Sequence, residues 1–142
     1  MIPAAASIFV PPYDHYVLTQ GVHGFSYGHM AIDISGGKGA TIYSPINGWV
    51  SALFVDDYGN TWIIIENEVY QVILLHGLYS VSVGDILTAG QVIGIESNQG
   101  NTVDGLGRSC RNRDCGYHTH LNVFNKLLGS NVNPLDLIPP NR

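Results

Sequence analysis

The sequence HTHLNV at residues 118–123 alternates polar and apolar side chains, which is the pattern of a half-buried β-strand. Because successive side chains of a strand point to opposite faces, His118, His120 and Asn122 share one face. The intervening residues, Leu121 among them, form an apolar face that can pack on a core. The segment therefore predicts a strand that presents two imidazoles beside one another above a β core.

A second segment, GHMAID at residues 28–33, places His29 and Asp33 on one face and Met30 and Ile32 on the other. Imidazole nitrogens and carboxylate oxygens are both zinc ligands. Residues four apart in a straight strand are separated by about 13 Å, so the chain must bend between His29 and Asp33 if both bind one ion. Together the two segments predict a metal site on a β core.

Short segments rich in β-branched and aromatic residues follow one another along the chain, separated by turn signals such as Asn47-Gly48 and Gly84-Asp85. No window has a convincing helical period. We predict strands at residues 7–10, 29–34, 49–55, 61–66, 70–75, 91–96 and 118–124. The fold class is all-β, an open antiparallel sheet or sandwich in one domain spanning residues 1–142. Residues 97–117 are predicted to be a long functional or disordered loop that leads into the last of these strands.

Composition excludes several classes of protein. The chain has 45% hydrophobic and only 12% charged residues, unlike a disordered chain. Its net charge of −5 and its six basic residues argue against nucleic-acid binding. No stretch approaches the roughly 20 apolar residues of a transmembrane helix. The start of the chain lacks the basic region of a signal peptide, which leaves either a cytosolic protein or a mature or excised domain.

Cys110 and Cys115 lie close enough in sequence to form a small disulfide loop in an oxidising compartment. The alternative is a structural zinc site that also includes His118 and His120. The disulfide is favoured because a structural zinc site would consume both histidines.

The same loop holds Arg108, Arg111 and Arg113. Their guanidinium groups are either solvated or bind a carboxylate of the substrate, which arginine does in a bidentate manner. Asn122, on the polar face of its strand, is a further candidate for contact with substrate.

Three other histidines remain. His76 follows four apolar residues and precedes a glycine, so it is expected at a strand end, as a catalytic imidazole or a partner of the metal ligands. His15 and His23 are interpreted as structural. Because His23 lies six residues before His29, a groove-lining role is its alternative.

The order His29-x-x-x-Asp33, then His76, then His118-x-His120 resembles that of the lysostaphin/LytM-type zinc endopeptidases. Residues 38–50 resemble a strand pair of this family, and residues 81–94 closely resemble its V-x-V-G-D hairpin. The resemblance extends over residues 21–124. An ordered set of five such residues is far more specific than any one motif.

The resemblance implies that His29, Asp33 and His120 bind one Zn²⁺ per chain, and that His76 and His118 are catalytic and flank the attacking water. Zinc would polarise the scissile carbonyl and acidify that water, and one of His76 and His118 would accept its proton. The implied fold is of the duplicated-hybrid-motif type, with a long groove. The implied substrates are peptides of bacterial peptidoglycan, cut in the cross-bridge or the stem. We expect a monomer outside the cytoplasm, in the cell envelope or secreted.

Departures from the family concern the surroundings of the site. Leu74 and Tyr117 stand where the family often has tyrosine and proline, and the turn before His118 is expanded by residues 103–116. Substrate specificity is therefore the property that the resemblance predicts least. One alternative is an inactive relative that binds peptidoglycan or regulates a partner.

Two carrier domains are further alternatives. A histidine phosphocarrier domain would use two histidines but would not require the His-x-x-x-Asp segment. A lipoyl-type carrier is excluded because neither Lys38 nor Lys126 lies at the tip of the 81–94 hairpin.

Overall fold

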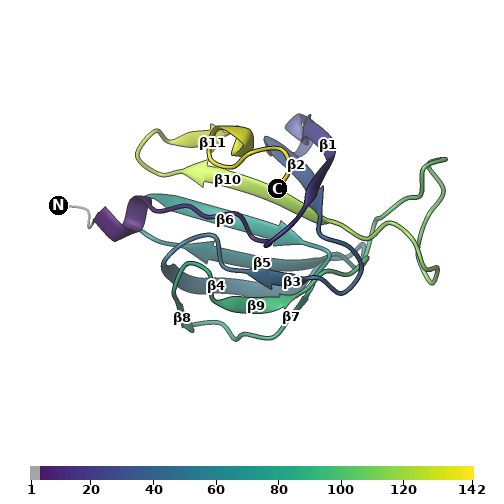
Figure 1. Cartoon of the computed structure of the whole chain (residues 1–142), viewed down its shortest axis with the longest axis horizontal. Coiled ribbons are helices and arrows are strands. Elements are labelled where there is room, and N and C mark those ends of the chain that lie inside the picture. Colours follow the sequence, from purple (N-terminus) through teal and green to yellow (C-terminus); the bar gives the residue numbers. More distant parts are fainter. Residues whose placement is uncertain (1–3) are drawn as a thin grey trace.

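The computed structural model describes residues 4–142, and over this range it contains two antiparallel sheets and no α-helix (Figure 1). The large sheet has the order β1 (Val17–His23), β2 (Ala31–Ser35), β10 (Thr119–Asn125), β6 (Tyr70–Leu75), β5 (Thr61–Glu66), β4 (Gly48–Val55) and β8 (Ile86–Leu87), with β11 (Ser130–Val132) paired to β10. The small sheet has the order β3 (Thr41–Tyr43), β9 (Val92–Ile95) and β7 (Leu78–Tyr79). Three short 3₁₀-helices complete the secondary structure: η1 (Ala4–Ser7), η2 (Phe25–Tyr27) and η3 (Pro134–Asp136). The predicted all-β antiparallel fold is confirmed.

One hydrophobic core joins the two sheets. Ile42 and Ile93 of the small sheet are fully buried in the same cluster as Ile32, Leu74 and Leu121 of the large sheet. Each of these strands therefore gives its apolar face to the core. On β2 and β10 the other face carries polar side chains, Asp33 and His120 among them.

Strand β10 runs along the middle of the large sheet between β2 and β6. Its register pairs His120 with Asp33 on one side and with Leu75 on the other. Leu121 and Val123 are fully buried, as the alternating pattern predicts. The side chains of His120 and Asp33 therefore lie next to one another on the face opposite the core.

A buried carboxylate lies beneath these strands. Glu96, which is 1% exposed, accepts hydrogen bonds from the Tyr13 hydroxyl, the Ser35 hydroxyl and the Gly36 backbone N–H at 2.8–2.9 Å. The Tyr13 hydroxyl is also hydrogen-bonded to Thr119, which lies between His118 and His120 in the chain. The network ties the N-terminal segment and β9 to the two strands that carry the polar face.

Two predictions about strands are corrected. The segment 7–10 is not a strand: residue 7 ends η1, and Val10 forms a single backbone hydrogen bond to Pro45. Conversely, β1 was not predicted; it is a largely exposed edge strand whose pairing with β2 contains two register shifts. Such an edge strand has no regular alternation for a sequence pattern to reveal.

The long loop at residues 97–117 is present as predicted and projects from one end of the sheets (Figure 1). Its regular structure is limited to one isolated bridge between Val103 and Ser109. In the described part of the chain, no helix is long and apolar enough to cross a membrane.

Candidate metal and catalytic site

Three donor groups surround one point on the polar face of β2 and β10. The Oδ1 atom of Asp33 lies 3.4 Å from Nε2 of His23 and 3.3 Å from Nδ1 of His120, and the three donor atoms all lie within 4.8 Å of one another. Asp33 is 7% exposed, and its Oδ1 is the only buried side-chain polar atom of residues 4–142 without a hydrogen-bond partner. A buried carboxylate oxygen without a donor is costly, so this arrangement fits a bound cation.

Asp33 is held in its ionised form. Burial on its own would raise the pKa of this carboxyl group, but the His120 imidazole, 3.3 Å from Oδ1, and the neighbouring His118 and His23 imidazoles lower it below its ordinary value of 3.8. The group is therefore a carboxylate at neutral pH, which is the form that binds metal.

His29 lies on the other side of the His120 ring. Its Nδ1 is 2.9 Å from Nε2 of His120, the ring nitrogen that faces away from Asp33. His29 follows the turn formed by η2 and Gly28, with φ of 82°, and precedes β2, which begins only at Ala31, so His29 is not part of the strand that carries Asp33. Burial, followed by the neighbouring His120 and His23, lowers the pKa of His29 to about 4. The predicted set of His29, Asp33 and His120 is thus brought together, but His29 contacts His120 and not the carboxylate.

His76 lies directly after β6, where the sequence places it. Its backbone is left-handed, with φ of 81°, an uncommon conformation outside glycine that is found often at functional sites. Nδ1 is 2.8 Å from the carbonyl oxygen of Gln99, so it carries the proton and leaves the lone pair of Nε2 free. Burial, followed by the nearby His118, lowers the pKa of His76 to about 4. The imidazole is therefore neutral at neutral pH.

His118 faces His76 across the site, with 4.7 Å between ring centroids. Its Nδ1 lies 2.8 Å from the Gly116 carbonyl, and its Nε2 lies 3.6 Å from Oδ2 of Asp33. His76 and His118 are therefore oriented in the same way: a backbone carbonyl holds Nδ1, and Nε2 is left for other partners.

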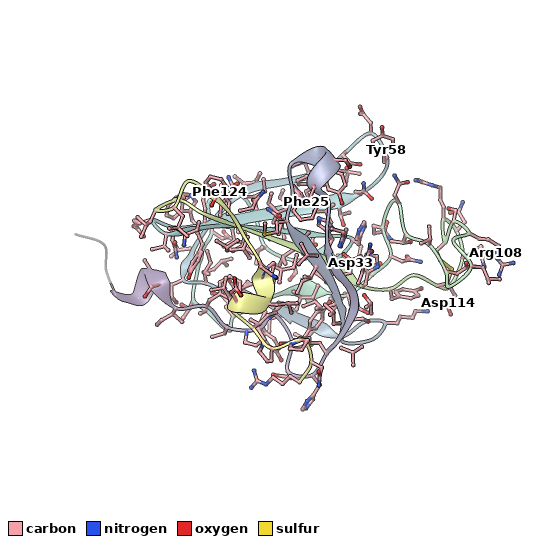
Figure 2. All side chains as sticks on the ribbon, turned by 90° about the horizontal axis from the view of Figure 1, so that it is seen from above. Phe25, Asp33, Tyr58, Arg108, Asp114 and Phe124 are labelled. Carbon is pink, nitrogen blue, oxygen red and sulfur yellow. A yellow bond between two sulfur atoms is a disulfide. The ribbon has the colours of Figure 1, made fainter. Side chains whose placement is uncertain are left out.

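These groups lie in a groove of about 960 Å³. One wall comes from β1 and the turn before β2, the second from the β4–β5 hairpin, and the third from the long loop. Five histidines line the groove: His23, His29, His76, His118 and His120. Its other aromatic and acidic lining residues include Tyr27, Asp33, Tyr58, Trp62, Asp104 and Tyr117. In Figure 2, Asp33 lies at the foot of the projecting loop, and Tyr58 lies across from it on the hairpin.

The loop is closed by the predicted disulfide between Cys110 and Cys115. The alternative structural zinc site is therefore not formed, because both sulfur atoms are in the disulfide. Cys110 is fully buried within the loop.

The three arginines of the loop bind groups of the protein. Arg108 and Arg113 both pair with Asp104 at 3.0 Å, and Arg111 donates to the Tyr58 carbonyl. Arg108 lies at the outer end of the loop, far from Asp33 (Figure 2). None of the three is among the residues that line the groove. Their contact with substrate stays a prediction, and their observed role is to brace the loop.

Asn122 is covered by its neighbours and is not among the residues that line the groove. Its side chain is 2% exposed, accepts a hydrogen bond from the backbone N–H of Met30, and donates one to Asn131. Its contact with substrate stays a prediction, and in the structure β11 and the residue before β2 cover this part of the polar face. Asn122 instead fixes the segment that carries His29.

Sequence patterns did not identify His23 as a candidate metal ligand. It lines the groove and contacts Asp33, which confirms the alternative given for it above. Its position depends on the pairing of β1 with β2, where His23 lies opposite Ala31. The only local signal was its closeness in sequence to His29.

The comparisons with known proteins agree with the fold. The family model described as peptidase family M23 matches residues 27–134. A zinc-containing peptidase from Vibrio cholerae has a TM-score of 0.68 and 23% identity over 90% of this chain, which spans 39% of that protein's length. LytU has a TM-score of 0.64 and 23% identity over 94% of both chains. The catalytic domain of the antimicrobial peptidase lysostaphin from Staphylococcus simulans has a TM-score of 0.61 and 20% identity over 85% of this chain and 90% of its own. At these identities the structures share the fold. No curated protein sequence matches the chain.

Proposed function

The chain belongs to peptidase family M23, and we propose that it is a zinc-dependent endopeptidase that hydrolyses peptide bonds of bacterial peptidoglycan, in the cross-bridge or the stem. The observation that carries this proposal is the buried Oδ1 atom of Asp33, which has no hydrogen-bond donor and faces ring nitrogens of His23 and His120. A hydrolase site with an oxygen and two imidazole nitrogens in this arrangement suits zinc.

The metal would be held by Asp33, His120 and a third ligand from the segment that precedes β2. The family-like spacing His29-x-x-x-Asp33 assigns the third ligand to His29, and the donor distances favour His23. When bound there, zinc polarises the scissile carbonyl and acidifies water.

His76 and His118 would carry out the proton transfers. Each has its Nδ1 proton held by a backbone carbonyl, so each can accept a proton at Nε2 from the attacking water. The imidazolium formed can then donate that proton to the departing amine. Before this transfer, the same Nε2–H of the imidazolium can hydrogen-bond the developing oxyanion. Because a backbone carbonyl holds Nδ1 of both imidazoles in the same way, either His76 or His118 can act as the base.

The groove suits an extended peptide. It is lined on several sides by aromatic rings, including Tyr27, Trp62 and Tyr117, and Trp62 is fixed by its N–H donating to Asp56 at 2.9 Å. Aromatic side chains provide large contact areas with small conformational freedom to lose. The similarity to lysostaphin, an antimicrobial peptidase, supports bacterial peptides as the substrate class.

The disulfide supports a location outside the cytoplasm. Disulfides persist in oxidising compartments and are rare in the cytosol. The Cys110–Cys115 bridge lies within the loop that forms one wall of the groove, so an oxidising compartment suits the working form of the protein. Peptidoglycan lies in such a compartment.

The test is direct. Zinc in the purified protein is measured by mass spectrometry, and purified peptidoglycan is then digested and the products are analysed for new amino termini. We expect about one zinc per chain and new amino termini that disappear after chelation and in His118→Ala. Zinc binding together with binding to peptidoglycan, but without new amino termini, would establish the inactive relative instead.

A further inference from the structure

We infer that His23 supplies the third protein ligand of the metal, and that His29 orients His120 by a hydrogen bond. This inference rests on the proposed metal site and concerns which of this chain's histidines completes it. It departs from the ligand set that the sequence motif implies.

The donor distances favour His23. Ligands arranged tetrahedrally at about 2.1 Å from a zinc ion lie about 3.4 Å from one another. Oδ1 of Asp33 lies 3.4 Å from Nε2 of His23 and 3.3 Å from Nδ1 of His120. Within residues 4–142 the histidines with a ring nitrogen within 4.0 Å of an Asp33 carboxylate oxygen are His23, His118 and His120, and His29 is not among them.

The protonation of His23 points in the same direction. Its Nδ1 lies 2.8 Å from the carbonyl oxygen of Gly21, which can only accept a hydrogen bond. The neutral imidazole therefore carries its proton on Nδ1 and directs the lone pair of Nε2 towards Oδ1 of Asp33. That oxygen has no hydrogen-bond partner, so two electron-rich atoms face one another across 3.4 Å. A cation between them removes this repulsion.

The contact between His29 and His120 fits a supporting role for His29. If Nδ1 of His120 binds the metal, its Nε2 carries the proton and donates to Nδ1 of His29, 2.9 Å away. Metal-bound histidines nearly always donate their second N–H to such a partner, which fixes the tautomer and the ring orientation. Trp62 and Tyr27 pack against the His29 ring, with centroids 5.9 and 5.2 Å away, and hold it in this place.

The backbone explains how His23 reaches the site. A register shift between Gln20 and His23 ends the regular pairing of β1, and His23 lies opposite Ala31 at the start of β2. Gly24, with φ of 95°, then turns the chain; a Cβ on this residue would lie 2.9 Å from Cβ of His29. The glycine thus allows His23 and His29 to approach the two sides of His120 from one short segment.

The test is a measurement of metal affinity and coordination, independent of turnover. Zinc dissociation constants are measured by competition with a chromogenic chelator for the wild type, His23→Ala, His29→Ala and the matched control His15→Ala. His15 is an exposed histidine outside the groove. Cobalt(II) is bound to the same proteins, and its visible absorption reports the number and type of ligands. Circular dichroism checks folding, and His23→Gln provides a second variant that keeps the size of the side chain.

We expect His23→Ala to weaken zinc binding at least 100-fold and to change the cobalt spectrum. His29→Ala is expected to weaken binding about 10-fold to 100-fold with the spectrum retained, and His15→Ala to behave as the wild type. Zinc affinity of His23→Ala and His23→Gln within a factor of two of the wild type, with loss of metal in His29→Ala, overturns the inference. If both His23→Ala and His29→Ala lose the metal and alter the spectrum, both histidines are ligands. The inference is then right for His23 and wrong for His29. A wild type that binds no zinc refutes the proposed function itself.

Discussion

The Nδ1 atom of His118 is hydrogen-bonded to the carbonyl oxygen of Gly116 over 2.8 Å. This bond links a candidate catalytic imidazole directly to the backbone of the disulfide-closed loop. Gly116 has φ of 75° and packs against Cys110 and Thr102, where a Cβ would come within 2.9 Å of each side chain. The position of the imidazole therefore depends on close packing inside the loop.

Replacement of Gly116 tests this dependence. Gly116→Ala adds a steric clash to a strained backbone conformation, at a cost of about 1–3 kcal/mol. We expect turnover to fall at least about 10-fold, since a displaced general base loses most of its contribution, while zinc content stays unchanged. Gly107→Ala is the matched control, because Gly107 has a similar φ of 78° but nothing within 4 Å of an added Cβ. Equal effects in the two variants would mean that backbone strain, and not the contact with Cys110 and Thr102, limits turnover.

Removal of the disulfide is expected to loosen the wall of the groove without removal of the metal. The chain-entropy model gives about 2 kcal/mol for a loop of this size, and this stabilisation is local to the 110–115 segment. In Cys110→Ser/Cys115→Ser, trypsin should cleave the native protein faster after Arg108, Arg111 or Arg113, as mass spectrometry of the fragments would reveal. Zinc content should match that of the wild type. Unchanged protection of the three arginine sites would show that Asp104 and the packing alone hold the loop.

Separate variants of the four central residues should divide into two classes. Asp33→Ala and His120→Ala remove donors from the proposed metal site, so zinc should be lost together with activity. His76→Ala and His118→Ala should keep zinc and lose turnover by about 10²–10⁴-fold, the usual contribution of a general acid or base. Metal analysis and kinetics on the same samples make the distinction. Full turnover in either His76→Ala or His118→Ala would contradict its assigned role.

The β4–β5 hairpin gives a prediction for stability against pH. Burial on its own would raise the pKa of Asp56, but hydrogen bonds from the Trp62 indole and from Asn60 lower it below its ordinary value of 3.8. A folded-state pKa below the unfolded value stabilises the protein above about pH 4, and this stabilisation is lost as the pH falls through the lowered value. Asp56→Asn should therefore lower Tm by roughly 3 °C at pH 7 and by less at pH 3. The neighbouring, exposed Asp57 supplies the control variant Asp57→Asn; the same pH-dependent loss there would exclude the Trp62 contact as the cause.

Strand alternation alone located much of the site. The HTHLNV segment forms the predicted strand, β10. Asp33 and His120 lie together because β2 and β10 are neighbours. The sequence also predicted that the chain bends before Asp33. The strand and the turn before β2 are local features, which depend on side-chain periodicity and on glycine positions within a few residues; the meeting of Asp33 and His120 is not local, and the family resemblance implied it.

The features that escaped prediction depend on pairing between distant segments. The contact of His23 with Asp33 needs β1 to pair with β2 through an irregular register. The burial of Asn122 needs β11 and the Met30 backbone to cover it. Residues 7–10 are apolar enough for a strand, yet residue 7 belongs to η1 and Val10 bonds to the Pro45 carbonyl and not to a strand. In each case the deciding contact lies outside the window in which periodicity can be read.

The Glu96 network has a consequence for how the chain assembles. Tyr13 is separated from Glu96 by 83 positions and from Thr119 by 106, so its hydroxyl group joins segments made early and late in synthesis. Until the Tyr13 segment has docked, the buried carboxylate lacks one of its three hydrogen-bond donors, which is costly in a dry interior. Contacts of such long sequence separation form late because the loop entropy must be overcome first. The polar face therefore acquires its final form only after the segments around residues 13, 96 and 119 have all docked, and copies that end before Thr119 remain without an ordered candidate site.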